Sequence, residues 1–432
     1  MTRYDLFYFA LAPVAVPVIA WRALTKSKYR ESLPGMFGRG WNPADPSLWQ
    51  NGSIWLHAVS YGEAMAAKAL LPLLRTENPH WPLVLTTVTE TGQSLARSFQ
   101  PAFADHVCYF PADLSPVVKR FVRTFQPRLM VIMETELWPN AIMIAAQAGA
   151  HVIIANGRIS DKSFPNYMRL RRVLRQPLSH VRAFCMQTET DAERVRAIVG
   201  EGARVFVTGN CKFDAPPRPL EENRRAELLR RCGIPPTDPV IVVGSTHAGE
   251  EEIVLRAFEE VRVHIPSLRL ILAPRHPERF DTVWQLLGKT PYSCCRFSET
   301  TARGSLVSTP DIVLVDQMGV LAELYGIATV GVVAGSFVPG IGGHNLLEAA
   351  AHAVPVVYGP FMDKQPELVR ILTKENGGLQ VSSAELGTVL VKLLEDPSLR
   401  AELGKRASQA VERQRGAAAR TMDVIRQVLH ER

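Results

Sequence analysis

The sequence predicts an α/β protein built from two doubly wound units. Short apolar runs alternate with helix-like segments along most of the 432 residues. The runs are mostly continuous, as in strands buried on both faces of a parallel sheet. A chain of this length exceeds one ordinary core, and a stretch rich in proline and charge divides the alternation into two halves. We therefore expect two Rossmann-like units that face each other across a cleft, with ligands at the carboxyl ends of the strands.

An apolar segment lies near the start of the chain. Residues 6–21 are uncharged and strongly apolar, but as a straight helix they span only about 24 Å, short of the roughly 30 Å hydrocarbon core. Basic residues cluster between 22 and 30, whereas only Arg3 precedes the segment, so the positive-inside rule keeps the remaining chain in the cytoplasm. We expect residues 1–30 to form a membrane anchor or an interfacial helix. A buried core helix is the alternative.

The first predicted unit covers residues 31–213. It ends at a linker over residues 214–238, where prolines and charges interrupt the alternation. The strands expected in this unit are residues 54–59, 83–87, 106–110, 129–133, 151–155, 183–186 and 205–208. Their carboxyl ends should share one edge of the sheet, so the polar residues that follow them are candidates for a site.

Carboxylates follow two of these strands. Glu63 stands where a helix begins after the first strand, and Glu134 and Glu136 follow the fourth. A glutamate in a first helical turn is common and mildly stabilising, so this feature alone does not mark Glu63 as functional. Its expected position, facing the cleft at the end of the first strand, makes it a candidate. Buried carboxylates need cations or water, and Arg158, after the next strand, is the candidate cation for Glu134 and Glu136. A structural ion-pair cluster is the alternative to catalysis.

A basic stretch spans residues 166–182. Leucines fall on one helical stripe, with arginines at 169, 171, 172 and 175 to its sides. Such a helix can lie on an anionic membrane surface or hold the phosphates of an acceptor. A solvated arginine face over a core stripe is the alternative. Aromatic residues are not interleaved with the arginines as on a nucleic-acid platform, so no nucleic-acid partner is expected.

The second predicted unit covers residues 239–432. Its expected strands are residues 240–244, 270–273, 312–315, 330–334 and 354–358. A last helix pattern, from about residue 399 onward, is charged and rich in arginine. We expect this helix to be able to pack back on the first unit.

A glycine-rich loop in the second unit is the strongest indication of a ligand site. The loop separates the strand that ends at residue 334 from a helix pattern that begins at Leu346, and its glycines are Gly335, Gly340, Gly342 and Gly343. Glycines allow the backbone to approach a ligand, and the first N–H groups of a helix have no internal partner. The arrangement therefore favours an anion such as phosphate.

Glu348 does not suit a phosphate, because a carboxylate would repel it. It suits the hydroxyls of a sugar, and the alternative is a capping box with Asn345. Further candidates for phosphate or base contacts follow other strands of this unit or lie at its boundary: Ser245, Arg275, His276, Met318, Gly319 and Lys212. Helix capping and ordinary turn chemistry are the alternatives for several of these.

Composition and missing motifs exclude several classes of protein. The net charge is +7, which fits an anionic partner without naming one. The 6 cysteines form no C-x-x-C pair, so zinc and haem sites are not expected and reduced thiols are the simplest account. The chain has no P-loop, no HExxH and no G-x-S-x-G, and the first unit has no dinucleotide fingerprint.

The motifs after the strands, taken together, resemble those of the 3-deoxy-D-manno-octulosonic acid (Kdo) transferases. The matching segments run in order from about residue 55 to 360 and read HAVSYGE, ETELWPN, NGRIS, GSTHAGEE, PRHPER, VDQMG and GSFVPGIGGHNLLE. The resemblance implies a GT-B glycosyltransferase with two Rossmann-like domains and an N-terminal membrane-associated helix. It implies CMP-Kdo as donor and a lipid A precursor (lipid IVA) as acceptor in lipopolysaccharide core biosynthesis, at the cytoplasmic side of the cell inner membrane.

The resemblance also assigns roles to residues. Glu63 in SYGE matches the general base of the family, while the donor-binding loops match Arg275, His276, Met318, Gly319, Val320, Asn345, Leu346, Leu347 and Glu348. Leu346 and Ala349 stand where the family often has proline, which bears on loop rigidity. An inverting transfer needs one carboxylate to accept the proton of the acceptor hydroxyl and fixed positive dipoles to hold the departing phosphate. CMP is a sufficient leaving group, so no metal or other cofactor is expected.

Two other functions remain open from the residues alone. A nucleotide-sugar epimerase on the same two-unit fold would need no lipid and would give the apolar N-terminus no purpose. A membrane scaffold without catalysis would bind CMP and transfer nothing. The sequence also leaves open which of Glu63, Glu134 and Glu136 contacts the acceptor.

Overall fold

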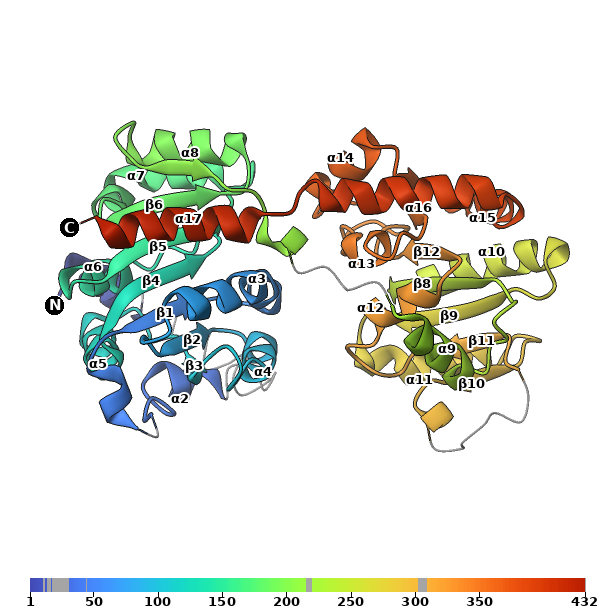
Figure 1. The fold of residues 1–432 in the computed structure, drawn as a ribbon, viewed down its shortest axis with the longest axis horizontal. Helices are drawn as coiled ribbons and strands as arrows, with labels where there is room; N and C mark the ends of the chain where they lie inside the picture. The colour runs from blue at the N-terminus through green and yellow to red at the C-terminus, as the bar shows by residue number, and fades with distance from the viewer. Residues whose placement is uncertain are drawn as a thin grey trace. The chain divides into compact units, whose positions relative to one another are not determined.

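The computed structural model describes residues 1–10, 12, 13, 17, 31–43, 45–214, 220–301 and 309–431. The chain divides into two compact units (Figure 1). Unit 1 comprises Met1–Ala215 and Gln414–Arg432, and unit 2 comprises Pro216–Arg413. The C-terminal residues thus belong to the unit formed by the first half of the chain.

Unit 1 contains a parallel sheet of seven strands in the order β3-β2-β1-β4-β5-β6-β7. The strands are β1 (Ser53–His57), β2 (Leu83–Thr87), β3 (His106–Tyr109), β4 (Pro127–Met133), β5 (His151–Gly157), β6 (Val181–Met186) and β7 (Val205–Val207). The chain builds β2 and β3 on one side of β1 and then returns to β4 on the other side. This reversal is the topological switch point, where doubly wound sheets bind ligands.

The helices of unit 1 cover both faces of this sheet. They are α2 (Ser32–Met36), α3 (Tyr61–Glu77), α4 (Glu90–Arg97), α5 (Ser115–Phe125), α6 (Pro139–Gln147), α7 (Phe164–Leu178), α8 (Glu189–Val199) and α17 (Ala417–His430), with short 3-10 turns η1 (Pro46–Trp49) and η2 (Cys211–Asp214). Successive strand residues enter opposite cores, because side chains alternate along a strand. Ile54 and Leu56 pack with α3 and α17, whereas Trp55 packs with α5 and α6.

Helix α17 completes one of these two cores. It packs against α3, β5 and β6 (Figure 1), and its side chains Met422, Ile425 and Val428 are buried there. Asp214 accepts hydrogen bonds from the backbone N–H groups of Gly416 and Ala418 at the start of the helix. The single C-terminal helix pattern expected from about residue 399 is two helices, because a left-handed turn at Gly416 separates them.

Unit 2 contains a second parallel sheet of seven strands, in the order β10-β11-β9-β8-β12-β13-β14. The strands are β8 (Val240–Thr246), β9 (Arg269–Pro274), β10 (Cys294–Arg296), β11 (Ile312–Leu314), β12 (Val330–Val333), β13 (Val356–Tyr358) and β14 (Gly378–Gln380). Here the chain reverses between β8 and β12. The sequence prediction missed β10 and β14, because these edge strands have three residues each and are only partly buried.

The helices of unit 2 include one in the range expected to be a linker. They are α9 (Glu222–Arg231), α10 (Glu250–His264), α11 (Phe280–Leu287), α12 (Leu321–Leu324), α13 (Leu347–Ala350), α14 (Pro366–Lys374), α15 (Leu386–Glu395) and α16 (Pro397–Glu412), with 3-10 turns η3 (Pro277–Arg279), η4 (Glu299–Thr301) and η5 (Tyr325–Ile327). Leu228 and Leu229 of α9 are buried, and Arg225 donates to the carbonyl of Gly326 at 2.6 Å. The short amphipathic pattern of α9 lies between two groups of prolines, which is why the sequence suggested a linker instead of a helix.

The N-terminal residues 3–10 are helical and are held to unit 1 by a polar network. Asp5 accepts hydrogen bonds from the backbone of Ser115 at 2.8 Å and from Asn140 at 3.1 Å, and the Tyr8 hydroxyl donates to Asp113 at 2.7 Å. Most of the expected anchor, namely residues 11, 14–16 and 18–30, lies outside the described residues. None of the helices in the described ranges combines the length and the apolar character needed to span a membrane.

Replacing Ile425 with alanine should destabilise unit 1, because the Ile425 side chain is fully buried against α3 and the sheet. We expect a loss of roughly 2–5 kcal/mol in the free energy of unfolding. Tryptophan fluorescence during urea unfolding measures this, since every tryptophan except Trp284 precedes residue 215. Val263→Ala, at a side chain that is 80% exposed, is the control. Equal unfolding curves for the two variants would contradict the placement of α17.

Candidate active site

The carboxylates predicted from the sequence gather at the switch point of unit 1. Glu63 lies in the first turn of α3, directly after β1, while Glu134 and Glu136 follow β4. Strands β1 and β4 are hydrogen-bonded neighbours, so these loops leave the same edge of the sheet. The three groups interact: burial, the largest effect, and the negative charges of Glu134 and Glu136 together raise the pKa of Glu63 to about 8.

Glu63 is fixed in place by the turn that precedes its helix. Its Oε2 accepts a hydrogen bond from the backbone N–H of Val59 at 2.5 Å, and its Oε1 accepts from the Ser60 hydroxyl at 3.1 Å. Ser60 is the extended N-cap residue of α3. Glu63 therefore stabilises the start of the helix, as a first-turn glutamate does. The same two donors orient a carboxyl group that is only 7% exposed.

Glu134 has a different cationic partner from the one expected. Its carboxylate pairs with Lys212 of η2, with Nζ and Oε1 3.2 Å apart. Arg158 is exposed and its side chain forms no ion pair among the described residues. Instead its backbone N–H donates to the Thr135 hydroxyl, and that hydroxyl donates to the Arg158 carbonyl. The prediction that Arg158 compensates Glu134 is therefore wrong, because η2 returns to this edge from much later in the chain.

The backbone at Glu134 is in an unusual conformation. Its φ angle is 58°, in the left-handed region that residues other than glycine rarely adopt. The backbone N–H of Glu134 donates to the carbonyl of Ala155 in the neighbouring strand at 2.8 Å. This turn ends β4 abruptly and directs the Glu134 side chain to Lys212.

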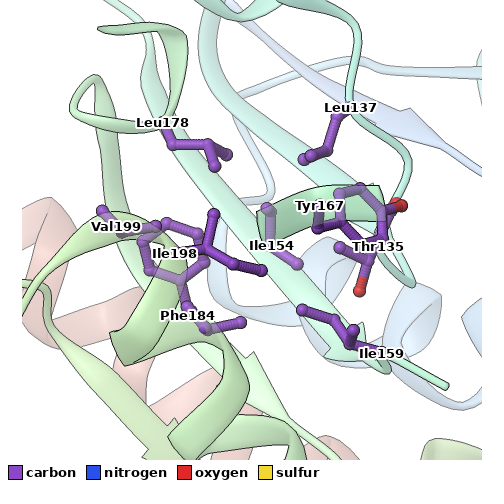
Figure 2. A pocket seen from close by; sticks show the side chains of 10 residues that line it. Thr135, Leu137, Ile154, Ile159, Tyr167, Leu178, Phe184, Ile198 and Val199 are labelled. Atoms are coloured by element: carbon purple, nitrogen blue, oxygen red, sulfur yellow. The ribbon is translucent and has the colours of Figure 1, made fainter. Parts of the chain in front are cut away.

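An apolar pocket lies beside these carboxylates in unit 1 (Figure 2). Burial and the charge of Glu134 raise the pKa of Glu136, and Glu136 in turn helps to raise the pKa of Tyr167, which lines the pocket. The lining residues are Thr135, Leu137, Ile154, Ile159, Tyr167, Leu178, Phe184, Val195, Ile198 and Val199. Only Thr135 and Tyr167 bring hydroxyl groups to it, so the pocket does not suit a charged nucleotide.

The first residues of the glycine loop of unit 2 bind a carboxylate of the protein itself. Glu250, at the start of α10, accepts hydrogen bonds from the backbone N–H groups of Gly335, Ser336 and Phe337 at 2.7, 3.0 and 2.9 Å. The first amides of the loop are thus occupied by a fully buried carboxylate of the protein itself. The helix that follows, α13, has only one turn. The amides of Gly335, Ser336 and Phe337 are therefore not free for a ligand, and an anion would have to bind later in the loop.

Gly342 and Gly343 are required by packing. Both have φ angles near 90° in the left-handed region (91° and 82°). A Cβ atom on Gly342 would lie 2.7 Å from the Lys364 side chain, and one on Gly343 would lie 2.3 Å from Met362. The glycines thus let the loop close onto residues 362–364, and Gly342 accepts a hydrogen bond from the Lys364 backbone at 2.9 Å.

The segment from Asn345 to Glu348 has a capping arrangement with a half-buried acid. Asn345 accepts a hydrogen bond from the Leu347 backbone at 3.1 Å, and its amide lies 3.5 Å from Glu348 Oε1. Burial raises the pKa of Glu348, and Asn345 and Arg275 oppose that shift. Leu346 and Leu347 are buried, so their side chains are not available to a ligand.

A cluster of cationic and histidine side chains surrounds the switch point of unit 2. We call His247, Arg275, His276, His344 and Lys364 the basic cluster. His247 follows β8 and His344 follows β12, the strands on either side of the reversal. Their Nε2 atoms are 2.8 Å apart, and the ring of His276 lies perpendicular to that of His247, with the centroids 5.2 Å apart.

The surroundings of His247 and His344 favour the neutral form of both rings. Burial, the largest effect, and neighbouring positive charges, including those of Arg275 and Lys364, together lower the pKa values of His247 and His344 to about 4. Arg275, His276 and Lys364 are exposed, so the cluster is open to solvent. Its arginine and lysine side chains supply positive charge for an anion.

Of the basic cluster, only Arg275 and His276 were predicted from the sequence. His247 was visible in GSTHAGEE, directly after a predicted strand, and His344 in GIGGHN, at the end of the glycine loop. What was missing was that β8 and β12 are neighbours. Lys364 lies beyond the segment that carried a motif.

The remaining candidates of unit 2 lie around this edge. Ser245 is half-buried at the end of β8 with a φ angle of 63°, again left-handed. Met318, Gly319 and Val320 follow β11, which β9 separates from β8. Met318 is 54% exposed. In the described ranges, no group of three or more His, Cys, Asp or Glu side chains is placed to hold a metal ion.

Comparison with known proteins identifies the family. A family model described as 3-Deoxy-D-manno-octulosonic-acid transferase (kdotransferase) matches residues 31–215. The 3-deoxy-D-manno-octulosonic acid transferase of Haemophilus influenzae is 32% identical over 439 residues, which cover 99% of each chain. That of Chlamydophila psittaci is 29% identical over 428 residues, covering 99% of this chain and 96% of the relative.

Solved structures share the fold. A glycosyltransferase from Rickettsia africae has a TM-score of 0.59 and 11% identity, and it covers 88% of this chain and 100% of its own. A UDP-GlcNAc 2-epimerase from Neisseria meningitidis bound to UDP-GlcNAc has a TM-score of 0.57 and 13% identity, with the same coverage. At such identities the likeness concerns the fold alone. The two parallel-sheet α/β units are consistent with a GT-B-like fold, and the full-length match confirms the resemblance of the motifs: the chain belongs to the 3-deoxy-D-manno-octulosonic acid (Kdo) transferases, a family of glycosyltransferases.

Proposed function

We propose that this Kdo transferase moves Kdo from CMP-Kdo to a lipid A precursor, lipid IVA, in lipopolysaccharide biosynthesis, with inversion at the anomeric carbon. The observation that supports this most directly is the buried Glu63, whose pKa is raised to about 8 at the switch point of unit 1. A carboxylate with a pKa that high is a stronger proton acceptor than an ordinary glutamate.

In the proposed reaction Glu63 acts as general base. It accepts the proton of the acceptor hydroxyl as that oxygen attacks the anomeric carbon, and the bond to the CMP phosphate breaks. Lys212, through its ion pair with Glu134, limits the negative charge beside Glu63. In unit 2 the basic cluster stabilises the phosphate that departs, with the charge of Arg275 and Lys364 already in place. The proposal thus assigns the steps of Kdo transfer to particular residues of this chain.

The epimerase alternative rests on the fold alone, because the similar epimerase structures share only low identity with this chain. The scaffold alternative has no supporting observation. Incubation of the purified full-length protein with CMP-Kdo and lipid IVA, followed by mass spectrometry, tests the proposed substrates. We expect products heavier by whole Kdo units. Transfer of Kdo to another acceptor but not to lipid IVA would contradict the proposed acceptor.

We also propose that one surface of unit 1 lies on an anionic membrane, at the cytoplasmic side of the inner membrane. Leu6, Phe7 and Phe9 of the N-terminal helical residues are 62%, 59% and 55% exposed. The Tyr4 hydroxyl donates to the carbonyl of Val173 in α7 at 2.8 Å, which joins this apolar surface to the exposed arginines of α7 at 169, 171, 172 and 175. Apolar side chains beside cations suit an interfacial contact.

Replacing Glu63 with glutamine should lower the turnover of Kdo transfer by roughly a hundredfold or more, because a base contributes about that factor. CMP affinity, measured by calorimetry, should change little, since Glu63 belongs to unit 1. Glu90→Gln, at an exposed first-turn glutamate of α4, is the matched control. The wild-type rate should rise with pH through about 8, where Glu63 loses its proton. Full activity of the glutamine variant would exclude Glu63 as the base.

The raised pKa of Glu63 also predicts how stability depends on pH. The folded protein holds the Glu63 proton up to about pH 8, whereas an unfolded glutamate releases it near 4.5. Stability from this group is therefore complete below about 4.5 and is lost as pH rises through about 8. The melting temperature of wild type relative to Glu63→Gln should fall over that interval. A difference that stays constant with pH would show that Glu63 has an ordinary pKa.

Replacing Arg171 and Arg172 together with glutamine should weaken binding to vesicles that contain anionic lipid. Each arginine near such a surface contributes about 1 kcal/mol, so a loss of more than about tenfold is expected in a sedimentation assay. A double variant of two exposed arginines in unit 2, Arg256→Gln with Arg370→Gln, is the control. Equal losses for both pairs would indicate a nonspecific effect of net charge.

A further inference from the structure

The histidine pair of unit 2 has the geometry of a shared-proton hydrogen bond. The Nε2 atoms of His247 and His344 are 2.8 Å apart, while the ring centroids are 5.1 Å apart and the ring planes differ by 6°. A centroid separation so much longer than the N···N distance means that the rings meet edge to edge. One Nε2 must therefore donate its proton and the other must accept it.

This arrangement leaves room for one more proton. Two neutral imidazoles carry two protons on four ring nitrogens, and one of those protons lies between the facing Nε2 atoms. The ring that donates through Nε2 therefore has a bare Nδ1, which is where an added proton would bind. Neither Nδ1 atom of His247 or His344 has a hydrogen-bond partner in the described part of the chain. After protonation both Nδ1 atoms would carry N–H groups, and the pair would hold one positive charge.

Burial and the positive charges around the pair favour its neutral form. Arg275, His276 and Arg279 face it from the loop after β9, and Lys364 faces it from the segment before α14. A further positive charge among these groups is unfavourable without a counter-ion. An anion bound here would remove that penalty and would raise the pKa of the pair.

Acidic groups close to the cluster are already engaged. Glu250 accepts hydrogen bonds from the backbone N–H of His247 at 2.9 Å and from the loop amides. Glu251 pairs with Arg279 at 2.9 Å, Glu278 is 3.9 Å from His276 Nδ1, and Glu348 interacts with Arg275. These contacts leave the ring nitrogens of the histidine pair themselves without an acidic partner.

We propose that the His247–His344 pair is a proton-accepting anion receptor, which takes up one proton from solvent when the phosphate or the carboxylate of the donor binds beside it. The inference rests on the proposed function, because a nucleotide-linked octulosonic acid carries both kinds of anion. The uptake makes the pair a cationic donor of two N–H groups. The proton returns to solvent when the anionic product leaves.

Calorimetry of the full-length protein tests this proposal. CMP is titrated near pH 6.5 in two buffers of different ionisation enthalpy, which measures the protons taken up on binding. We expect wild type to take up more protons, by as much as about one, than His247→Gln or His344→Gln, because glutamine donates hydrogen bonds but does not protonate. CMP affinity should fall by roughly ten- to a hundredfold in these variants. His264→Gln, at an exposed histidine in unit 2, is the control.

Two further titrations distinguish the source of the anion. Free Kdo supplies a carboxylate without phosphate, and cytidine supplies the nucleoside without either. Uptake with CMP alone assigns the pair to the phosphate, and uptake with Kdo alone assigns it to the carboxylate. Equal uptake by wild type and both histidine variants, with CMP and with Kdo, would overturn the proposal. Failure of wild type to bind CMP or Kdo at all would instead overturn the proposed function, and this inference with it.

A measurement on the wild-type protein tests the proposal even if the histidine variants fail to fold. The ring-proton resonances of His247 and His344 are followed by NMR as pH is varied, with and without CMP or Kdo. Both should titrate at a higher pH when the anion is bound. Unchanged titration in the presence of saturating CMP and of saturating Kdo would contradict the proposal without any substitution.

Discussion

The pairing of strands across each switch point is the constraint on which both candidate sites depend. In unit 1 the chain returns to place β4 beside β1, and in unit 2 it returns to place β12 beside β8. The connections from these neighbouring strands run to opposite sides of the sheet, so their ends are not covered by each other's loops. Polar groups gather at those ends because they find solvent and ligands there, while the strands themselves are buried on both faces.

Each switch point stabilises an unusual backbone and an unusual acid. Glu134 at the end of β4 and Ser245 at the end of β8 both have left-handed φ angles, a conformation that persists only where surrounding contacts impose it. In unit 1 the buried acid is Glu63, whose carboxyl group binds the backbone of its own turn. In unit 2 it is Glu250, whose carboxylate binds three successive amides of the glycine loop. The two acids differ in their surroundings. Of the two, only Glu63 has carboxylate neighbours, and these favour its protonated form.

Glu250 occupies the first amides of the glycine loop, and the positive charge at this edge of unit 2 lies on the side chains of the basic cluster. An internal carboxylate already satisfies the strand-end amides that other wound folds offer to phosphate. The same carboxylate binds the backbone of His247 and of Gly335, and so ties the ends of β8 and β12 together. The His247 and His344 rings then meet over Gly335, where a Cβ atom would lie 2.4 Å from the His344 ring. The buried carboxylate of Glu250 thus holds the basic cluster together. In the sequence, Glu250 is only the first of three glutamates at the start of a helix.

The sequence by itself determined the family, the α/β class and most strands, because buried parallel strands leave continuous apolar runs and turns leave glycine, proline and polar residues between them. It also placed Glu63 at the end of β1, since that position depends only on the neighbouring residues. Only the tertiary structure decided the partners. Lys212 and Glu134 are 78 residues apart in the chain, Glu250 and Gly335 are 85 apart, and His247 and His344 are 97 apart. Such contacts follow from strand order, and strand order depends on pairings between distant segments that no local pattern records.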